Sequence, residues 1–211
     1  QLNIPGSETF VDIAAASRHG AGLRPDGTVV CWGYNADGQT DIPTEENYGF
    51  VDIEAGGYFT IGLRNDGTAY AWGFNGNGEC DIPLAEDGTT LTFTQLKAGF
   101  HHVISLTTDG SLICWGAGSS NDTFAYPNYG QSIPPINTSG QFTAIAAGAL
   151  HNMALTSGGD LLAWGAGTTN SGNYHEFGQA IPPTTEQFLQ LVSGLSLHSI
   201  VFVADDDLDG V

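Results

Sequence analysis

The chain has 211 residues, of which 41% are hydrophobic, so it can bury a core and is not expected to be disordered. It carries 4 Lys and Arg against 23 Asp and Glu, a formal net charge of -19 at pH 7 that repels phosphate backbones and anionic lipids. We therefore expect no nucleic-acid partner and no membrane insertion, and no apolar run approaches the roughly 18 residues of a membrane span. The 30 glycines predict the frequent tight turns of an all-β protein.

The segment that begins at Phe10 predicts three strands. The Phe-Val-Asp-Ile run at 10–13 and the alternating stretch that ends at Leu23 predict two half-buried strands. Asp-Gly at 26–27 predicts a hairpin turn, because Gly accepts a positive φ. Residues 28–32 predict a third strand, whose Trp fills the gap between neighbouring sheets. Ile-Pro at 42–43 ends strand pairing before the next unit.

The same pattern returns along the chain. Units begin near residues 10, 50, 93, 142 and 188, and each of the first four has a Leu, a turn Gly and a Trp-Gly at fixed spacing. Because one three-stranded sheet cannot bury both of its faces, the units must stack against one another. We therefore assign residues 1–203 to one array of tandem repeats.

One string carries a family resemblance. Leu-x-x-Asp-Gly-Thr-x-x-x-Trp-Gly-x-Asn-x-x-Gly-Gln at 23–39 resembles the regulator-of-chromosome-condensation repeat, and the short first two units are similar to its compact bacterial version. The resemblance implies an all-β fold of β-propeller-type blades. The fourth unit departs from the pattern with Ser-Gly-Gly-Asp at 157–160 in place of the Asp-Gly turn.

The array begins and ends inside the repeat pattern. Residues 1–5 align with 39–43, the tail of a unit, and the unit that opens at Phe188 has no Trp-Gly segment. The ring is therefore expected to be incomplete in this chain. More blades outside this segment, blades from another chain, or an unusual small or open arrangement are all consistent with the pattern.

The histidines are interpreted as packing residues rather than metal ligands. His19, His102 and His151 occupy one repeat position, where the second unit has Phe59. Interchange with an apolar ring argues for burial. The sequence also has no spaced nucleophile and base, phosphate loop or convincing pair of catalytic carboxylates, so we expect no enzymatic activity.

The three cysteines leave two alternatives open. A disulfide between adjacent units is predicted as Cys80–Cys114, with Cys31–Cys80 as its rival. The other alternative is three reduced thiols that serve as small core residues.

The acidic end of the chain, residues 204–211, is the sharpest chemical signal. Asp205, Asp207 and Asp209 alternate ahead of Gly210, an order that resembles the opening of calcium loops in thrombospondin type-3 and dockerin-like repeats. We expect Ca²⁺ to be bound there in the intact protein. The other interpretation is an acidic linker.

Two insertions, 117–129 and 166–177, are candidate binding loops. Asn, aromatic and His side chains on such loops can contact a protein or stack on a sugar, and the loops could instead cover an exposed sheet end. The candidate binding residues are Asn121, Phe124, Tyr126, Tyr129, Asn170, Tyr174, His175 and Phe177.

The function expected from these features is protein interaction. We expect a non-enzymatic module of a larger secreted or cell-surface protein that binds a protein partner through its loop face, with any signal peptide upstream of Gln1. One alternative is a self-assembling structural segment of an extracellular fibre or adhesin, because open blade ends can template assembly. Another is lectin-like glycan binding through the two insertions. Chromatin binding and nucleotide exchange are not expected, since fold does not carry function.

Overall fold

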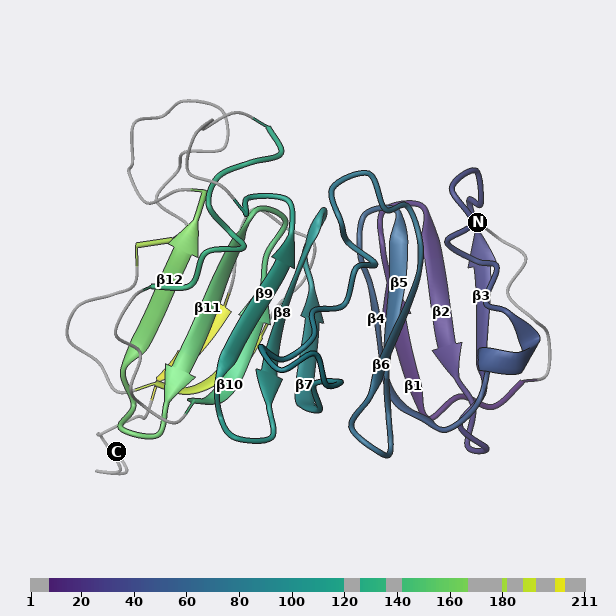
Figure 1. The fold of residues 1–211 in the computed structure, drawn as a ribbon, viewed down its shortest axis with the longest axis horizontal. Coiled ribbons are helices and arrows are strands. Elements are labelled where there is room, and N and C mark those ends of the chain that lie inside the picture. The colour runs from purple at the N-terminus through teal and green to yellow at the C-terminus, as the bar shows by residue number, and fades with distance from the viewer. Residues whose placement is uncertain are drawn as a thin grey trace, which may run out of the picture.

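The computed structural model describes residues 8–119, 126–135, 142–166, 180–181, 188–192 and 200–203, and they form an all-β array (Figure 1). Four antiparallel sheets follow one another, each with three strands in chain order. The strands are β1 (Asp12–Ala15), β2 (His19–Leu23) and β3 (Val29–Gly33); β4 (Phe50–Ala55), β5 (Phe59–Arg64) and β6 (Ala69–Gly73); β7 (Phe93–Ala98), β8 (His102–Thr107) and β9 (Leu112–Gly116); β10 (Phe142–Ala147), β11 (His151–Thr156) and β12 (Leu161–Gly165). A fifth, two-stranded sheet contains β13 (Phe188–Val192) and β14 (Ile200–Val203), and a 3-10 turn, η1, spans Thr44–Glu46.

The hairpins between the second and third strands form where Asp-Gly predicts them. Gly27 has a φ of 79°, and the Asp26 carboxylate accepts a hydrogen bond from the Thr28 N–H at 3.0 Å. The fourth unit makes its turn without this Asp-Gly pair. There Gly159 has a φ of 87°, and the Asp160 N–H donates to the Thr156 hydroxyl at 3.0 Å. A different residue therefore supplies the acceptor while the backbone turn is kept.

Each sheet packs face to face on the next, and the tryptophans lie at these junctions. Trp72, Trp115 and Trp164 are each 6% exposed and belong to three successive apolar clusters. This confirms that the Trp fills the gap between neighbouring sheets. The prediction that the second strand is half-buried was wrong, because residues 19–23, 59–63 and 102–107 are buried throughout. In the second and third sheets the middle strand has a sheet stacked on both sides, so neither of its faces meets solvent. In the first sheet the rings of Trp32 and Phe10 lie over Gly20 and Gly22 and cover the other face of β2.

The repeated histidines pack as predicted. His19, His102 and His151 are 4%, 0% and 0% exposed, and Phe59 at the same position is 0% exposed. The Nε2 atom of His102 lies 2.9 Å from the Asn152 side-chain oxygen. Burial lowers the pKa of His102 to about 4, so this ring is neutral at pH 7.

The predicted Cys80–Cys114 disulfide is not formed, nor is its rival Cys31–Cys80, because all three thiols are free. Cys80 packs with Ile113 between the second and third sheets, whereas Cys114 packs between the third and fourth. Ile113 and Cys114 are adjacent in β9, and successive side chains of a strand point to opposite faces. Cys114 therefore faces away from Cys80. Burial raises the pKa of each thiol to about 12, as expected for inert core residues.

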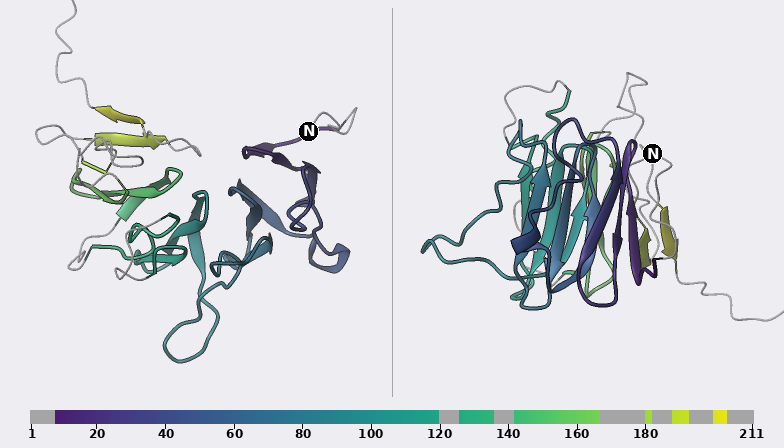
Figure 2. Two further views of the ribbon diagram at one scale, coloured as in Figure 1. Left: turned by 90° about the horizontal axis from the view of Figure 1, so that it is seen from above. Right: turned by 90° about the vertical axis from the view of Figure 1, so that its right-hand side faces the viewer.

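Seen from above, the sheets form an arc rather than a closed ring (Figure 2). The first strand of each unit lies on the inner side of the arc, and the first sheet and the β13–β14 pair stand at its two ends. The described residues include no helix with the length and apolar character to cross a membrane. The fold thus confirms β-propeller-type blades in an incomplete ring.

Candidate functional site

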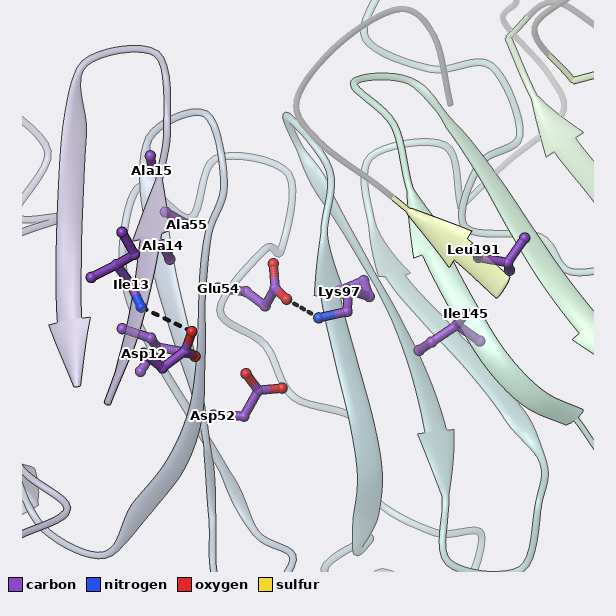
Figure 3. Close-up of a pocket in the computed structure, with 11 residues that line it drawn as sticks. Asp12, Ile13, Ala14, Ala15, Asp52, Glu54, Ala55, Lys97, Ile145 and Leu191 are labelled. Carbon is purple, nitrogen blue, oxygen red and sulfur yellow. Dashed lines mark hydrogen bonds and ion pairs between the residues drawn. The ribbon is translucent and has the colours of Figure 1, made fainter. Parts of the chain in front are cut away.

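The inner side of the arc contains a cavity of about 440 Å³ that is lined by first strands (Figure 3). Three carboxylates, Asp12, Asp52 and Glu54, and one cation, Lys97, line it. Lys97 forms an ion pair with Glu54 across the junction of β4 and β7. The described residues contain no group of three or more His, Cys, Asp or Glu side chains arranged to hold a metal ion.

Burial and neighbouring charges shift the pKa values of the ionisable groups in this cavity. Burial raises the pKa of Glu54, and Lys97 partly offsets this effect. The pKa of Asp52 is also raised, first by burial and then by the neighbouring Asp12 carboxylate. Burial alone would lower the pKa of Lys97, but the three carboxylates outweigh it and raise that pKa. The cavity thus carries more negative charge than its one lysine neutralises.

Replacing Asp52 with asparagine is expected to stabilise the protein at pH 7. The raised pKa means that the folded state disfavours the Asp52 charge, so this cost is present above the folded pKa and disappears as pH falls toward the unfolded value of 3.8. We expect a gain in unfolding free energy of about 0.2–1 kcal/mol at neutral pH, measured by urea denaturation, that shrinks on acidification. Asp37→Asn, a loop carboxylate outside the cavity, is the control and should change stability little. A loss of stability in Asp52→Asn would contradict the assignment.

We call the upper face the side of the molecule at the top of Figure 1, where β2 and β8 begin and β3 ends. An arginine and several aromatic side chains next to these strand ends contact one another there, and we call them the aromatic row. Arg18, Tyr58 and His101 occupy one repeat position, just before β2, β5 and β8. Tyr34 and Phe74 occupy a second position, just after the Trp-Gly that ends β3 and β6. Three consecutive sheets therefore contribute side chains to one surface.

The members of the aromatic row contact one another in sequence. The Arg18 guanidinium lies 5.5 Å from the Tyr34 ring centroid and 5.9 Å from that of Tyr58. The Tyr58 ring lies 5.5 Å from Phe100 and 6.1 Å from His101, measured between centroids. Cation–π and edge-to-face contacts of this kind hold rings in fixed orientations.

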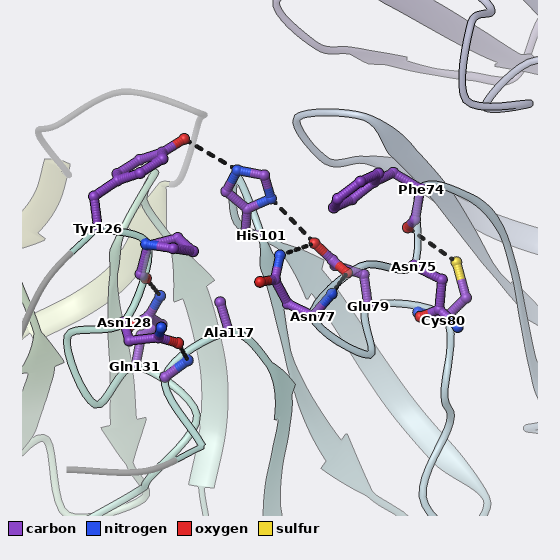
Figure 4. A network of polar contacts seen from close by, with 12 residues as sticks. Phe74, Asn75, Asn77, Glu79, Cys80, His101, Ala117, Tyr126, Asn128 and Gln131 are labelled. Atoms are coloured by element: carbon purple, nitrogen blue, oxygen red, sulfur yellow. Dashed lines mark hydrogen bonds and ion pairs between the residues drawn. The ribbon is translucent and has the colours of Figure 1, made fainter. Parts of the chain in front are cut away.

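His101 links the aromatic row to the end of the third-unit insertion (Figure 4). Its Nδ1 atom lies 3.0 Å from Glu79 Oε1, and its Nε2 atom lies 3.0 Å from the Tyr126 hydroxyl. Burial acts to raise the pKa of Glu79, but hydrogen bonds from His101 and Asn77 outweigh it, so this pKa is lowered. His101 itself is 7% exposed, whereas Tyr126 is 55% exposed. The buried ring therefore supports a tyrosine that faces solvent.

In each of the first three units, a buried Gln or Glu side chain forms a hydrogen bond with the backbone of the loop on the upper face. Gln39, Glu79 and Gln131 are all 0% exposed, and each side chain accepts a hydrogen bond from the backbone N–H two residues earlier. The backbone carbonyls of Glu79 and Gln131 also accept bonds from Trp115 and Trp164 of the next sheet, at 2.9 and 3.0 Å. These hydrogen bonds connect the upper loops to the sheets, so the backbone beneath the aromatic row is held in place.

Arg18 differs from the other cations of the chain. Arg24, Arg64 and Lys97 each pair with a carboxylate, the first two at 2.7 and 2.6 Å. Arg18 is exposed and has no ion pair with any residue that the structure describes. Its contacts are with two tyrosine rings, so its charge remains available to a ligand.

The structure brings only part of the predicted site together. Tyr126 belongs to the upper face, and Tyr129 is half-buried beside the small apolar cluster around Leu150. The other predicted residues lie outside the described part of the chain: Asn121, Phe124, Asn170, Tyr174, His175 and Phe177 for the binding loops, and Asp205, Asp207 and Asp209 for calcium.

Sequence reasoning missed Arg18, Tyr34, Tyr58, Phe74 and Phe100 as surface residues. A signal was present in the aligned repeats. The position before the second strand reads Arg, Tyr, His and Leu in the four units, and the one after Trp-Gly reads Tyr, Phe, Ala and Ala. Both positions vary in chemistry from unit to unit, and the second does so directly after an invariant Trp-Gly.

Comparisons with known proteins agree with the fold. No curated protein matches the chain. The ectodomain of the Physcomitrella patens receptor kinase CR4 is 25% identical, with a TM-score of 0.64, over 90% of this chain and 46% of that one. Prp20p from Saccharomyces cerevisiae is 21% identical, with a TM-score of 0.67, over 97% of this chain and 58% of that one. Human WBSCR16 is 18% identical, with a TM-score of 0.69, over 96% and 60%. The chain therefore spans about half of the length of these solved structures.

The repeats themselves match a family model. The model described as the regulator of chromosome condensation (RCC1) repeat matches residues 10–39, 50–79, 93–122 and 142–175, more than half of the chain. Each match contains one of the four three-stranded sheets. The chain belongs to the regulator of chromosome condensation (RCC1) repeat family.

Proposed function

We propose that this chain is a non-enzymatic protein-interaction module that binds its partner through the aromatic row on the upper face. One observation carries the proposal: an arginine without a carboxylate partner among the described residues stands between two tyrosines, in a row to which three consecutive sheets contribute. Tyrosine and arginine are the residue types that most often supply binding energy at protein interfaces.

The chemistry of the row favours a mixed apolar and acidic epitope. The rings of Tyr34, Tyr58 and Tyr126 offer flat area at low entropic cost, and their hydroxyls can bond to a partner. The Arg18 guanidinium can receive a carboxylate in a bidentate pair. It is an isolated positive charge on a chain of net charge -19, so it also selects where an acidic group can approach.

Two similarities support protein binding and an extracellular setting. Prp20p of Saccharomyces cerevisiae binds Gsp1p and histones, so an array of similar fold binds proteins. The CR4 structure is a receptor ectodomain, which supports our proposal that this chain works outside the cell or on its surface.

The proposal is tested by a matched pair of arginine variants. The chain is immobilised, proteins retained from extracts and culture fluid of the source organism are identified, and their affinities for each variant are measured. Arg18→Ala is expected to weaken binding at least about tenfold, as truncation at an interface hot spot does. Arg24→Ala removes the same charge at the opposite end of β2, where Arg24 pairs with Glu8, and is expected to leave binding unchanged.

Equal loss of binding in both variants would mean that net charge, not the aromatic row, governs retention. No loss in either variant would place the interface elsewhere. Either result contradicts the proposed site.

A further inference from the structure

One repeat position forms matched pairs of buried side chains across the sheet junctions. His19, Phe59 and His102 occupy it in the first three sheets, and the counterpart in the next sheet is the residue that follows the same position: Thr60, Val103 and Asn152. At the first junction, His19 Nε2 lies 3.0 Å from Thr60 Oγ1. At the third, His102 Nε2 lies 2.9 Å from Asn152 Oδ1. At the second junction, Phe59 and Val103 belong to one apolar cluster, so this place is polar at two junctions and apolar at the one between them.

The partner side chains determine where each histidine carries its hydrogen. Both partners donate to the backbone carbonyl of a buried glutamine: Thr60 to Gln39 at 2.9 Å, and Asn152 to Gln131 at 2.6 Å. The Thr60 hydroxyl has thus used its only hydrogen, and the Asn152 side-chain oxygen can only accept, so each histidine donates from Nε2. A neutral ring with its hydrogen on Nε2 has an unprotonated Nδ1. Both Nδ1 atoms are buried and form no hydrogen bond with any residue that the structure describes.

A second proton on either ring would bind at Nδ1, where no acceptor is available. Neither His19 nor His102 forms an ion pair with a carboxylate in the described part of the chain. The other charged or titratable groups nearest to the two rings are bases: Arg18 directly precedes His19, and His101 and His151 act on His102. Protonation would therefore place an uncompensated charge between two packed sheets, which is costly.

The direction of the pKa shifts agrees with this geometry. Burial lowers the pKa of His19 and of His102, to about 4 for His102, and the hydrogen bonds at each ring offset only part of the effect. The neutral rings therefore contribute stability above the unfolded pKa of about 6.5, and this contribution is lost as pH falls toward the folded pKa.

We propose that acid opens the first and third sheet junctions, because protonation of His19 and His102 places an unpaired charge in each, while the second junction stays closed. The stability of a repeat array is approximately a sum of terms for single units and for neighbouring pairs, so a charge at one junction weakens that junction first. Acid would thus release the first and fourth sheets from the second and third, which Phe59 and Val103 hold together. The switch lies within the junctions and does not depend on the proposed binding function.

Exchanging the pairs between junctions tests the role of the histidines. The double variant His102→Phe/Asn152→Val gives the third junction the apolar pair of the second. Urea denaturation between pH 7.5 and pH 4.5 measures both chains, and acidification should raise the unfolding constant of the unchanged chain at least about tenfold more than that of the variant. Asp52 and Glu54 titrate in the opposite direction in both chains, so the comparison removes their contribution. The reverse variant, Phe59→His/Val103→Asn, should be more sensitive to acid than the unchanged chain.

The three thiols report on the junctions one by one, because Cys31, Cys80 and Cys114 pack at the first, second and third. Labelling with a pyridyl disulfide reagent at pH 7.5 and pH 4.5, with the sites located by mass spectrometry, gives each rate relative to the urea-unfolded chain at the same pH. Acid should lower the protection of Cys31 and Cys114 at least about tenfold and leave Cys80 protected. In His102→Phe/Asn152→Val, Cys114 should also stay protected.

Two outcomes would overturn the proposal. One is equal sensitivity to acid in the unchanged chain and in His102→Phe/Asn152→Val. The other is a loss of protection at Cys80 together with Cys31 and Cys114, which would mean that the whole array unfolds at once and the junctions do not open separately.

Discussion

Ile53→Ala is expected to lower the free energy of unfolding by about 2–5 kcal/mol, the cost of emptying a well-packed apolar site. Ile53 is 3% exposed and packs at the junction of the first and second sheets. The loss has two parts. One is the lost transfer free energy of the removed side-chain atoms, and the other is the cost of the cavity, because the two sheets can relax only partially around it. Urea denaturation, followed by tryptophan fluorescence at low protein concentration, measures it.

Ile13→Ala is the internal control for Ile53→Ala, since both residues occupy the same position of the repeat. Ile13 is 69% exposed, so its truncation at low concentration should change the unfolding free energy by less than about 0.5 kcal/mol. Equal losses in the two variants would contradict the exposure of Ile13 in the folded protein.

Glu79→Ala is expected to destabilise the protein by about 3 kcal/mol, because buried donors left without an acceptor cost about 1–3 kcal/mol each. The Glu79 carboxylate accepts hydrogen bonds from the Asn77 N–H at 2.8 Å and from its side-chain amide at 2.7 Å. The same carboxylate lies 3.0 Å from His101, so the support of Tyr126 is lost as well. Thermal or urea unfolding measures the effect.

Glu79→Gln separates the charge of Glu79 from its shape. Gln39 and Gln131 hold the same place in the first and third units, so the amide should keep the loop closed and most of the stability. The folded pKa of Glu79 is lowered, so the carboxylate contributes stability above its unfolded pKa, near 4.5, and loses it as pH falls through the folded value. The small advantage of Glu over Gln should therefore disappear in acid. An advantage that grows in acid would contradict the hydrogen-bond assignment.

The repeat spacing was enough to predict the strands and to predict that the units stack against one another. Trp72, Trp115 and Trp164 lie at the sheet junctions because their position in the strand, not their surroundings, decides which face they point to. The same reasoning identified His19, His102 and His151 as core residues. Alternation within a strand decides to which side of the sheet a side chain points, and the equivalent residues of the other units point to the same side.

The predictions that were wrong or incomplete concern contacts between different units. Burial of both faces of β5 depends on having a sheet on either side, which no period within one strand reveals. The Cys80–Cys114 pairing failed because distance along the repeat says nothing of which face Cys114 points to across the junction. The aromatic row escaped notice because Arg18, Tyr58 and His101 are separated by whole units and differ in chemistry.

The side chains that hold the upper loops are different from the side chains that form most of the aromatic row. Gln39, Glu79 and Gln131 form hydrogen bonds with the loop backbones, so the side chains at positions 18, 34, 58 and 74 are not needed to form the loops. Each sheet thus exposes sites that can be replaced without disturbing its neighbours. A library randomised at these four positions should yield folded variants with new specificities, so the same frame can evolve toward different partners.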